Sequence, residues 1–143
     1  MVIEEIEFYK NHKLALDGRE TSDLQKHFET RSSLYRHLGI LPSLVKDNKV
    51  LEIGPGSGFN SLYTASLEPS HYVLVEGSSK SVENIKTLFS NYPFLEKRIQ
   101  IEEMMFEDFE SPYLFDIVLC ESVLHGMTDS LSALRKIATF VDN

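Results

Sequence analysis

The sequence predicts an α/β fold in which a parallel sheet lies between layers of helices. Short runs rich in branched apolar residues, at 50–53, 71–75 and 115–120, have the composition of strands that are buried on both faces. Between these runs, apolar residues recur three and four positions apart, which indicates amphipathic helices. Strands that alternate with helices are typical of parallel sheets. With 143 residues, the chain is long enough for one domain with a core of its own.

Two helices are predicted before the first strand. Residues 2–14 place apolar side chains three positions apart, and Gly18 then turns the chain. Ser22 can cap a second amphipathic helix, which Gly39 ends.

A glycine-rich turn follows the first predicted strand, in the stretch Gly54-Pro55-Gly56-Ser57-Gly58. Glycine permits positive φ, and because it has no Cβ, a ligand can lie against bare backbone. Dinucleotide-binding turns follow the pattern G-x-G-x-x-G, but here Phe59 stands where the third glycine would be. Pro55 removes an N–H at the point where a diphosphate would need donors, so the turn favours a ligand without phosphate groups. A tight loop that binds nothing is the alternative.

The remaining elements follow from helical spacing, alternation and helix-breaking residues. A helix from Ser57 is expected to end near Pro69, because the residue before a proline is driven out of helical geometry. The predicted elements after it are a strand over 71–75, a helix over Ser79–Ser90, a strand over 99–101, a strand over 115–120 and a last helix over 128–141.

Glu76 stands at the C-terminal end of the second predicted strand, 18 positions after Gly58. A carboxylate at that place can accept two hydrogen bonds from a ribose diol. The alternative is that Glu76 only caps the helix that follows. A glycine turn and an acid in register at one edge of the sheet favour a nucleoside ligand.

Four stretches between residues 50 and 127 resemble the motifs of class I S-adenosylmethionine-dependent methyltransferases. They are the first strand and turn with Glu52 just before it, the acid Glu76, the loop Met104 to Phe109, and the fourth strand with Phe115-Asp116 before it and Leu124-His125 after it. The resemblance implies a Rossmann-like three-layer sandwich with strand order 3-2-1-4. It also implies an N-terminal helical lid over residues 1–46, in which Arg31 and Tyr35 are expected to act on the cofactor. The alternative is that His27, Arg31, Tyr35 and His37 only lie at the solvated edge of a packing face. A cofactor-binding core over residues 47–143 would lack the family's usual strands 5 to 7.

The resemblance also assigns a cofactor, S-adenosyl-L-methionine, with S-adenosyl-L-homocysteine as its product. Its methionine end is expected at the turn and the acid before it, its ribose at the second strand, and its adenine at the loop after the third strand. The residues expected to contact the cofactor are Glu52, Gly54, Pro55, Gly56, Ser57, Gly58, Asn60, Glu76, Gly77, Met105, Phe106, Glu107, Cys120 and Glu121.

Two positions depart from the family pattern. Met105 stands where relatives carry an Asp at the adenine, so recognition would rest on the backbone at Met105 and Phe106 and on apolar contact, while a slip of one register would give that role to Asp108. The alternative is that Met104 and Phe106 are only core residues. Gly126 stands where many relatives carry a His, so a base at that position is absent. His125 remains as the candidate catalytic base, because an imidazole pKa near about 6.5 lets it take a proton at neutral pH. Helix capping or substrate packing is the alternative role for His125, and Cys120 is expected to be a small buried hydrophobe.

The function predicted is methyl transfer to a small-molecule acceptor by in-line displacement, with this chain as the N-terminal, cofactor-binding portion of the enzyme. The alternatives are a non-catalytic module that binds the nucleoside cofactor or a partner protein, and a nicotinamide-dependent oxidoreductase. Without a fifth strand, the fourth strand would be an exposed edge, which a homodimer could cover.

Composition and charge restrict the partners and the compartment. A net charge of −8, from 22 acidic and 14 basic residues without a basic stripe, disfavours nucleic acid. No apolar run approaches the roughly 20 residues needed to cross a bilayer. The single cysteine excludes an internal disulfide and a cysteine-rich zinc site, and no metal is expected. The features of a signal peptide are missing, so a cytoplasmic protein is expected.

Overall fold

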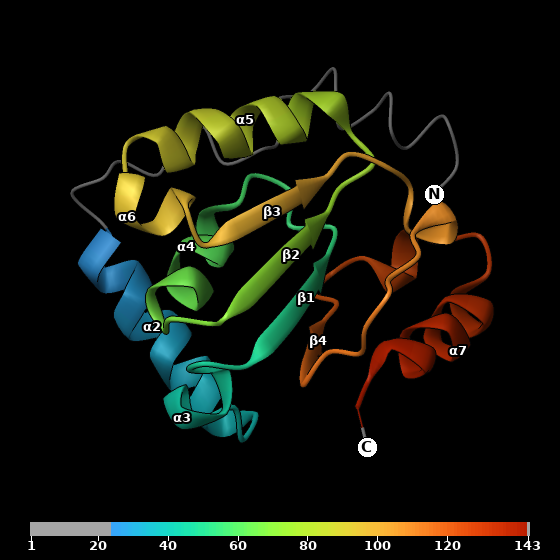
Figure 1. Cartoon of the computed structure of the whole chain (residues 1–143), viewed down its shortest axis with the longest axis horizontal. Coiled ribbons are helices and arrows are strands. Elements are labelled where there is room, and N and C mark those ends of the chain that lie inside the picture. Colours follow the sequence, from blue (N-terminus) through green and yellow to red (C-terminus); the bar gives the residue numbers. More distant parts are fainter. Residues whose placement is uncertain (1–23, 143) are drawn as a thin grey trace.

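The computed structural model describes residues 24–142, and these form a parallel sheet flanked by helices (Figure 1). The helix predicted over residues 2–14, the turn at Gly18 and the cap at Ser22 lie outside the described residues. The strands are β1 (Lys49–Ile53), β2 (His71–Val75), β3 (Ile99–Glu102) and β4 (Ile117–Leu119). Their order is β3-β2-β1-β4, and all three pairings are parallel. The predicted α/β class and strand order are confirmed.

Helices cover both faces of the sheet and give the fold three layers (Figure 1). They are α2 (Leu24–His37), α3 (Pro42–Val45), α4 (Phe59–Ser66), α5 (Ser79–Ser90), α6 (Pro93–Glu96) and α7 (Ser130–Phe140), with the short 3-10 helices η2 (Phe106–Asp108) and η3 (Leu124–Gly126). Along β1, Val50 packs with α2, α4 and α5, whereas Leu51 packs on the opposite face with α7. Both faces are buried, which is why the strands are apolar throughout. None of the described helices is both long and apolar enough to cross a membrane.

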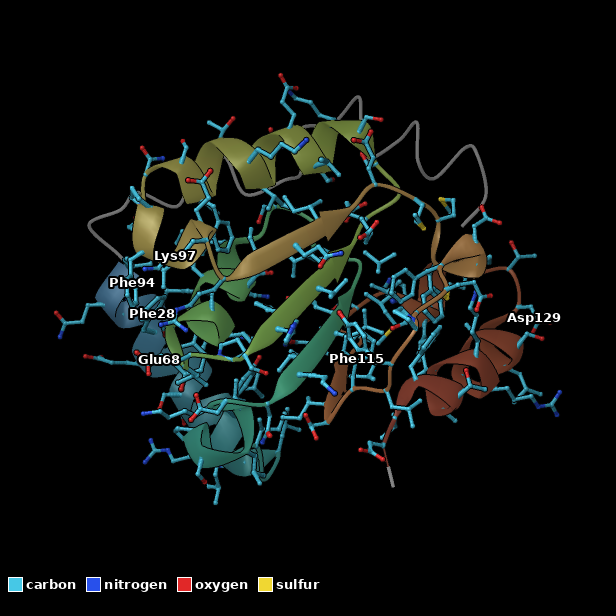
Figure 2. The ribbon with its side chains drawn as sticks, in the orientation of Figure 1. Phe28, Glu68, Phe94, Lys97, Phe115 and Asp129 are labelled. Atoms are coloured by element: carbon cyan, nitrogen blue, oxygen red, sulfur yellow. The ribbon has the colours of Figure 1, made fainter. Side chains whose placement is uncertain are left out.

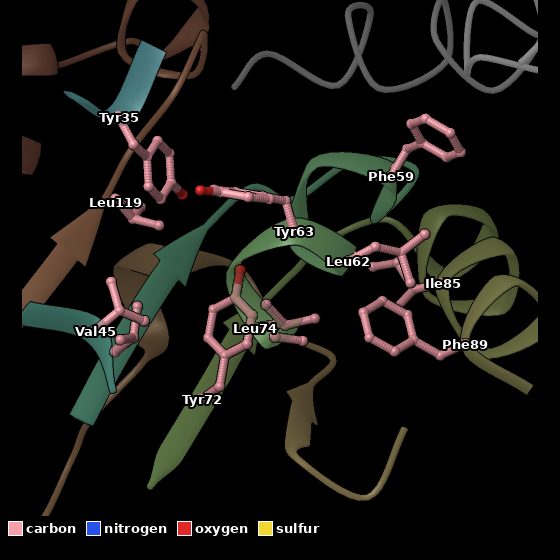
Figure 3. Close-up of a cluster of buried hydrophobic side chains, with 12 residues drawn as sticks. Tyr35, Val45, Phe59, Leu62, Tyr63, Tyr72, Leu74, Ile85, Phe89 and Leu119 are labelled. Carbon is pink, nitrogen blue, oxygen red and sulfur yellow. The ribbon is translucent and has the colours of Figure 1, made fainter. Parts of the chain in front are cut away.

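Aromatic side chains pack α2 against the face of the sheet that contains Val50 (Figure 3). The rings of Tyr35 in α2 and Tyr63 in α4 meet edge to face, with centroids 5.3 Å apart. The Tyr35 hydroxyl also forms a 2.6 Å hydrogen bond with the Thr64 hydroxyl. Although α2 belongs to the segment predicted as a lid, it shares the core of the sheet.

Element boundaries differ from the predicted ones by one to three residues where local geometry decides. Because Gly58 has a φ of 78°, it still belongs to the turn, and α4 begins at Phe59 instead of Ser57. Asp129 lies at the start of α7, where its Oδ1 accepts a 2.9 Å hydrogen bond from the Ser132 N–H (Figure 2). The fourth strand is shorter than the predicted 115–120 and covers Ile117–Leu119.

The chain after α7 returns to the beginning of β4. Phe115, which is fully buried on the α7 side of the sheet (Figure 2), donates its N–H to the Phe140 carbonyl at 2.7 Å. Its carbonyl accepts the Asp142 N–H at 2.9 Å, and Phe115 forms a parallel bridge with Val141. Within residues 24–142, no strand pairs with the outer edge of β4 at Ile117–Leu119.

Candidate functional site

The glycine turn after β1 requires glycine for both conformation and space. Gly54, Gly56 and Gly58 have φ values of 65°, 61° and 78°, in the left-handed region that side chains disfavour. A Cβ built on Gly54 would lie 2.5 Å from Cγ2 of Val123, in the loop after β4. The sequence therefore places bare backbone where the loop after β4 approaches the end of β1.

Glu76 leaves β2 at the same edge of the sheet and points at this turn. It is 7% exposed, and its Oε2 accepts the Gly56 N–H at 3.0 Å while its Oε1 accepts the Ser78 N–H at 2.9 Å. Burial raises the pKa of its carboxyl, against the opposing effect of these backbone hydrogen bonds. The cap of α5 is Ser78, whose Oγ accepts the Ser81 N–H, so Glu76 is not the residue that caps this helix.

A pocket lies between the turn, Glu76 and the loops after β3 and β4. Its lining residues are Ile53, Gly54, Val75, Glu76, Gly77, Met105, Phe106, Glu107, Val123 and Met127. The structure thus brings together six of the residues that the sequence placed at the cofactor, which are Gly54, Glu76, Gly77, Met105, Phe106 and Glu107. Val123 and Met127 line the pocket as well, and sequence analysis missed them because apolar residues in a loop carry no signal of their own.

The loop after β3 closes one side of this pocket. A Cβ on Gly77 would clash with Sδ of Met105, so the missing side chain lets the two loops meet. The Phe106 ring is buried against Phe140 of α7, with centroids 6.1 Å apart, so Phe106 is also part of the core. Asp108, the alternative residue for adenine, is exposed and does not line the pocket.

The loop after β4 forms the opposite side through Val123 and Met127, and Cys120 lies between β4 and this loop. Cys120 is half-buried among the apolar residues of the α7 face, and burial raises the pKa of its thiol. Ser122 has a φ of 56°, which is unusual for a residue with a side chain. This left-handed residue separates Glu121 from Val123, which lies over Gly54. Backbone in sparsely populated conformations is concentrated at functional sites.

Glu121 is held by Arg31 from α2. Nη1 of Arg31 donates to Oε2 of Glu121 at 2.8 Å, and Nη2 donates to Oε1 at 2.5 Å. The Arg31 side chain is 7% exposed and that of Glu121 34%. Burial alone would lower the pKa of Arg31, but the bonds to Glu121 outweigh it and the pKa is raised. Sequence analysis gave Arg31 and Glu121 separate roles and did not predict that they pair.

Glu52 lies behind the turn instead of lining the pocket. It is 4% exposed, and its Oε2 accepts hydrogen bonds from the hydroxyls of Ser61, at 2.8 Å, and Tyr72. Burial raises the pKa of its carboxyl, more than these two hydrogen bonds lower it. The structure therefore places Glu52 in the core between β1, β2 and α4, and its predicted contact with an ammonium group stays a prediction.

The other predicted residues lie near the pocket without lining it. Pro55 is buried, Ser57 and Asn60 are half-buried, and Ser57 Oγ accepts the Phe59 N–H at 3.3 Å, at the start of α4. His125 is exposed in η3, and its catalytic role stays a prediction. Within the described part of the chain, no group of three or more His, Cys, Asp or Glu side chains is arranged to hold a metal ion.

Sheet order and site together define the class of the protein. The strand order reverses between β1 and β4, and the turn, Glu76 and the loop after β4 all meet at the carboxyl ends of the strands beside this point. Open α/β domains bind their ligands in this crevice. A family model described as a methyltransferase domain matches residues 51–142, well over half of the chain, so the chain belongs to this family. The class I methyltransferase resemblance is thereby confirmed.

Solved structures show the same fold at low identity. The chain is 20% identical to Arabidopsis thaliana protein arginine methyltransferase 10, with a TM-score of 0.58 over 80% of this chain and 38% of that one. It is 22% identical to the Trypanosoma brucei PRMT1 enzyme-prozyme complex with AdoHcy, with a TM-score of 0.58 over 82% of this chain and 33% of that one. The [4+2]-cyclase SpnF is 18% identical, with a TM-score of 0.67 over 78% of this chain and 41% of that one. The chain thus spans less than half of these proteins. No curated protein sequence matches it significantly.

Proposed function

We propose that this chain binds S-adenosyl-L-methionine in the pocket between the glycine turn and Glu76. The observation that carries the proposal is the contact between Glu76 and the turn, because a buried carboxylate beside bare backbone is suited to a ribose diol. Membership of the methyltransferase domain family and the AdoHcy-containing relative support the same cofactor.

The residues present fit this cofactor better than a dinucleotide. The lining includes two acids, Glu76 and Glu107, and no lysine or arginine, so it offers no positive side chain to a diphosphate. Because Gly77 has no Cβ, the Met105 side chain can pack against the end of β2. There it could cover one face of a flat apolar base. Glu76 would hold the ribose, the backbone at Met105 and Phe106 would lie along the adenine, and Gly54 would lie under the methionine chain.

We further propose that the chain is the cofactor-binding portion of an enzyme that methylates a small molecule. When bound, S-adenosylmethionine supplies a methyl group on a sulfonium, which an acceptor takes by in-line displacement. The contribution of this chain would be orientation, because Glu76 and the turn fix the cofactor relative to the loop after β4. A net charge of −8 makes a nucleic-acid acceptor unfavourable. The residues that we assign to the cofactor lie between residues 52 and 121, and the chain spans only 38% and 33% of two of its relatives.

A second candidate is a module that binds the nucleoside cofactor without methyl transfer. One relative with the same fold is named a [4+2]-cyclase, so this fold occurs in a protein named for another reaction. The exposed position of His125, outside the pocket lining, also leaves the described residues without an imidazole at the pocket.

Calorimetric titration tests both proposals. Binding of S-adenosylhomocysteine that is tighter than binding of NAD supports the cofactor assignment, and the reverse order would indicate the nicotinamide alternative. If the cofactor binds, an assay of methyl transfer from labelled S-adenosylmethionine to a panel of small hydroxyl, amine and carboxyl compounds separates the enzyme from the non-catalytic module.

A further inference from the structure

Helix α7 holds the loop after β3 through Lys136 and Phe140. Nζ of Lys136 donates a 2.6 Å hydrogen bond to the carbonyl oxygen of Glu107 and lies 5.3 Å from the centroid of the Phe106 ring. That ring also packs against Phe140, at a centroid distance of 6.1 Å. Phe106 and Glu107 both line the pocket, so two adjacent lining residues are fixed from the α7 side.

The main contact of the Lys136 ammonium group is the Glu107 carbonyl. The ammonium also lies 3.9 Å from Oε1 of Glu110, but the Glu110 side chain is 89% exposed, and ion pairs of this kind contribute little. The Lys136 side chain itself is 23% exposed, so its bond to the carbonyl is partly shielded from water. Removal of this ammonium would therefore change the Glu107 carbonyl more than it changes the surface.

With Lys136 in place, every backbone carbonyl from residue 105 to residue 107 accepts a hydrogen bond. The carbonyls of Met105 and Phe106 each accept the N–H three residues further along the chain, both at 3.1 Å, and that of Glu107 accepts Lys136. The N–H groups of the same three residues donate no hydrogen bond to any part of residues 24–142. Each backbone unit carries one donor and one acceptor, so this loop offers a ligand donors in preference to acceptors.

A loop of donors distinguishes between purine bases. The N1 atom of adenine is a hydrogen-bond acceptor, whereas hypoxanthine carries a donor there, an N1–H beside a carbonyl. We propose that Lys136 is a specificity-determining residue, which by occupying the Glu107 carbonyl leaves the loop suited to adenine and unsuited to hypoxanthine. The inference rests on the proposed function, which places the base along this loop. It gives α7, none of whose residues lines the pocket, a part in selecting the ligand.

Two ligands that differ only in the base test the proposal by calorimetric titration. S-adenosylhomocysteine carries adenine, and S-inosylhomocysteine carries hypoxanthine on the same ribose and amino-acid chain. The wild-type protein should bind the first about 10- to 100-fold more tightly, because hypoxanthine would leave donor facing donor. Lys136→Met keeps the aliphatic chain but frees the Glu107 carbonyl to accept the N1–H. In this variant the preference for the adenosyl ligand should fall to less than about threefold.

Further variants separate base selection from a structural tie. Lys136→Arg can still donate to the carbonyl and should retain most of the preference, whereas the shorter Lys136→Gln should lose it, so the test does not depend on one variant. Glu110→Gln removes only the 3.9 Å ion pair and should leave the preference unchanged. Arg135→Met, at an exposed position on the same helix, is the matched control and should leave both affinities unchanged. Urea denaturation shows that each variant is folded under the conditions of titration.

The outcomes distinguish the inference from the proposed function. Equal weakening of both ligands in Lys136→Met and Lys136→Gln would show that Lys136 only holds the loop against α7, and would overturn the inference while cofactor binding stands. Equal affinity of the wild-type protein for the two ligands would overturn it in the same way. If the wild-type protein binds neither ligand, the proposed function is overturned and the inference with it.

Discussion

Replacing Glu76 by alanine is expected to weaken binding of S-adenosylhomocysteine by about 1–3 kcal/mol, or about 5- to 150-fold in Kd. The magnitude follows from the position of the carboxylate, which is 7% exposed and lies 3.0 Å from the Gly56 nitrogen. A ribose diol at this place would donate to a charged, desolvated acceptor, and hydrogen bonds to charged groups contribute more than neutral ones. The two hydroxyls share one carboxylate, so their contributions are not expected to add in full.

The same substitution also removes the acceptor of two backbone N–H groups, those of Gly56 and Ser78. We expect the free energy of unfolding to fall by about 1–3 kcal/mol for this reason, measured by urea denaturation. Binding is therefore measured by calorimetry under conditions where the variant is fully folded. Glu83→Ala is the control, because Glu83 is an exposed acid on α5 that pairs only with Lys80 among the contacts of the described residues.

An unchanged affinity in folded Glu76→Ala would refute the reasoning, because it would place the ribose away from this carboxylate. Equal weakening in Glu83→Ala would do the same, since it would show that any loss of negative charge near α5 has this effect.

Three further predictions concern the turn and two buried groups. Gly54→Ala is expected to lower the free energy of unfolding, measured by urea denaturation, by about 2–4 kcal/mol, because the alanine would have a left-handed φ and its Cβ would clash with Val123. Gly39→Ala is the control and should cost only about 1 kcal/mol, because Gly39 also has a positive φ, of 76°, but no heavy atom lies within 4 Å of a Cβ built there. Burial raises the pKa of Glu52 in the folded protein, so the stabilisation from its bound proton is present below about pH 4.5 and is lost as the pH rises through the folded pKa. Melting temperatures of wild-type and Glu52→Gln should therefore shift in favour of the variant with rising pH, and a constant difference would contradict this. Because burial raises the pKa of Cys120 above 9.0, its alkylation by iodoacetamide near neutral pH should be slower than that of a free thiol peptide, and an equal rate would contradict its burial.

Local sequence signals were sufficient to predict the helices and strands and the residues at the centre of the pocket. A strand of branched apolar residues followed by glycines at alternate positions predicts both β1 and the left-handed turn at Gly54, because the conformation of each residue depends on its own side chain. Glu76 could be placed at the turn because parallel strands end at one edge of a sheet, so acid and turn meet whatever the details of packing.

Contacts between distant segments could not be predicted in this way. Arg31 and Glu121 are 90 positions apart, and their pairing depends on how α2 packs on α4, for which the sequence carries no direct signal. The burial of Glu52 was missed for a related reason. Its side chain alternates to the α4 face of β1, where Tyr72 and Ser61 supply hydroxyl donors that a strand pattern does not reveal.

A crystal structure of the protein soaked with S-adenosylhomocysteine tests the central claim most directly. We predict density for the nucleoside between the 54–58 turn and the loop after β3, with both ribose hydroxyls within hydrogen-bond distance of the Glu76 carboxylate. Density for the ligand elsewhere on the molecule, or a ribose beyond the reach of Glu76, would contradict the account.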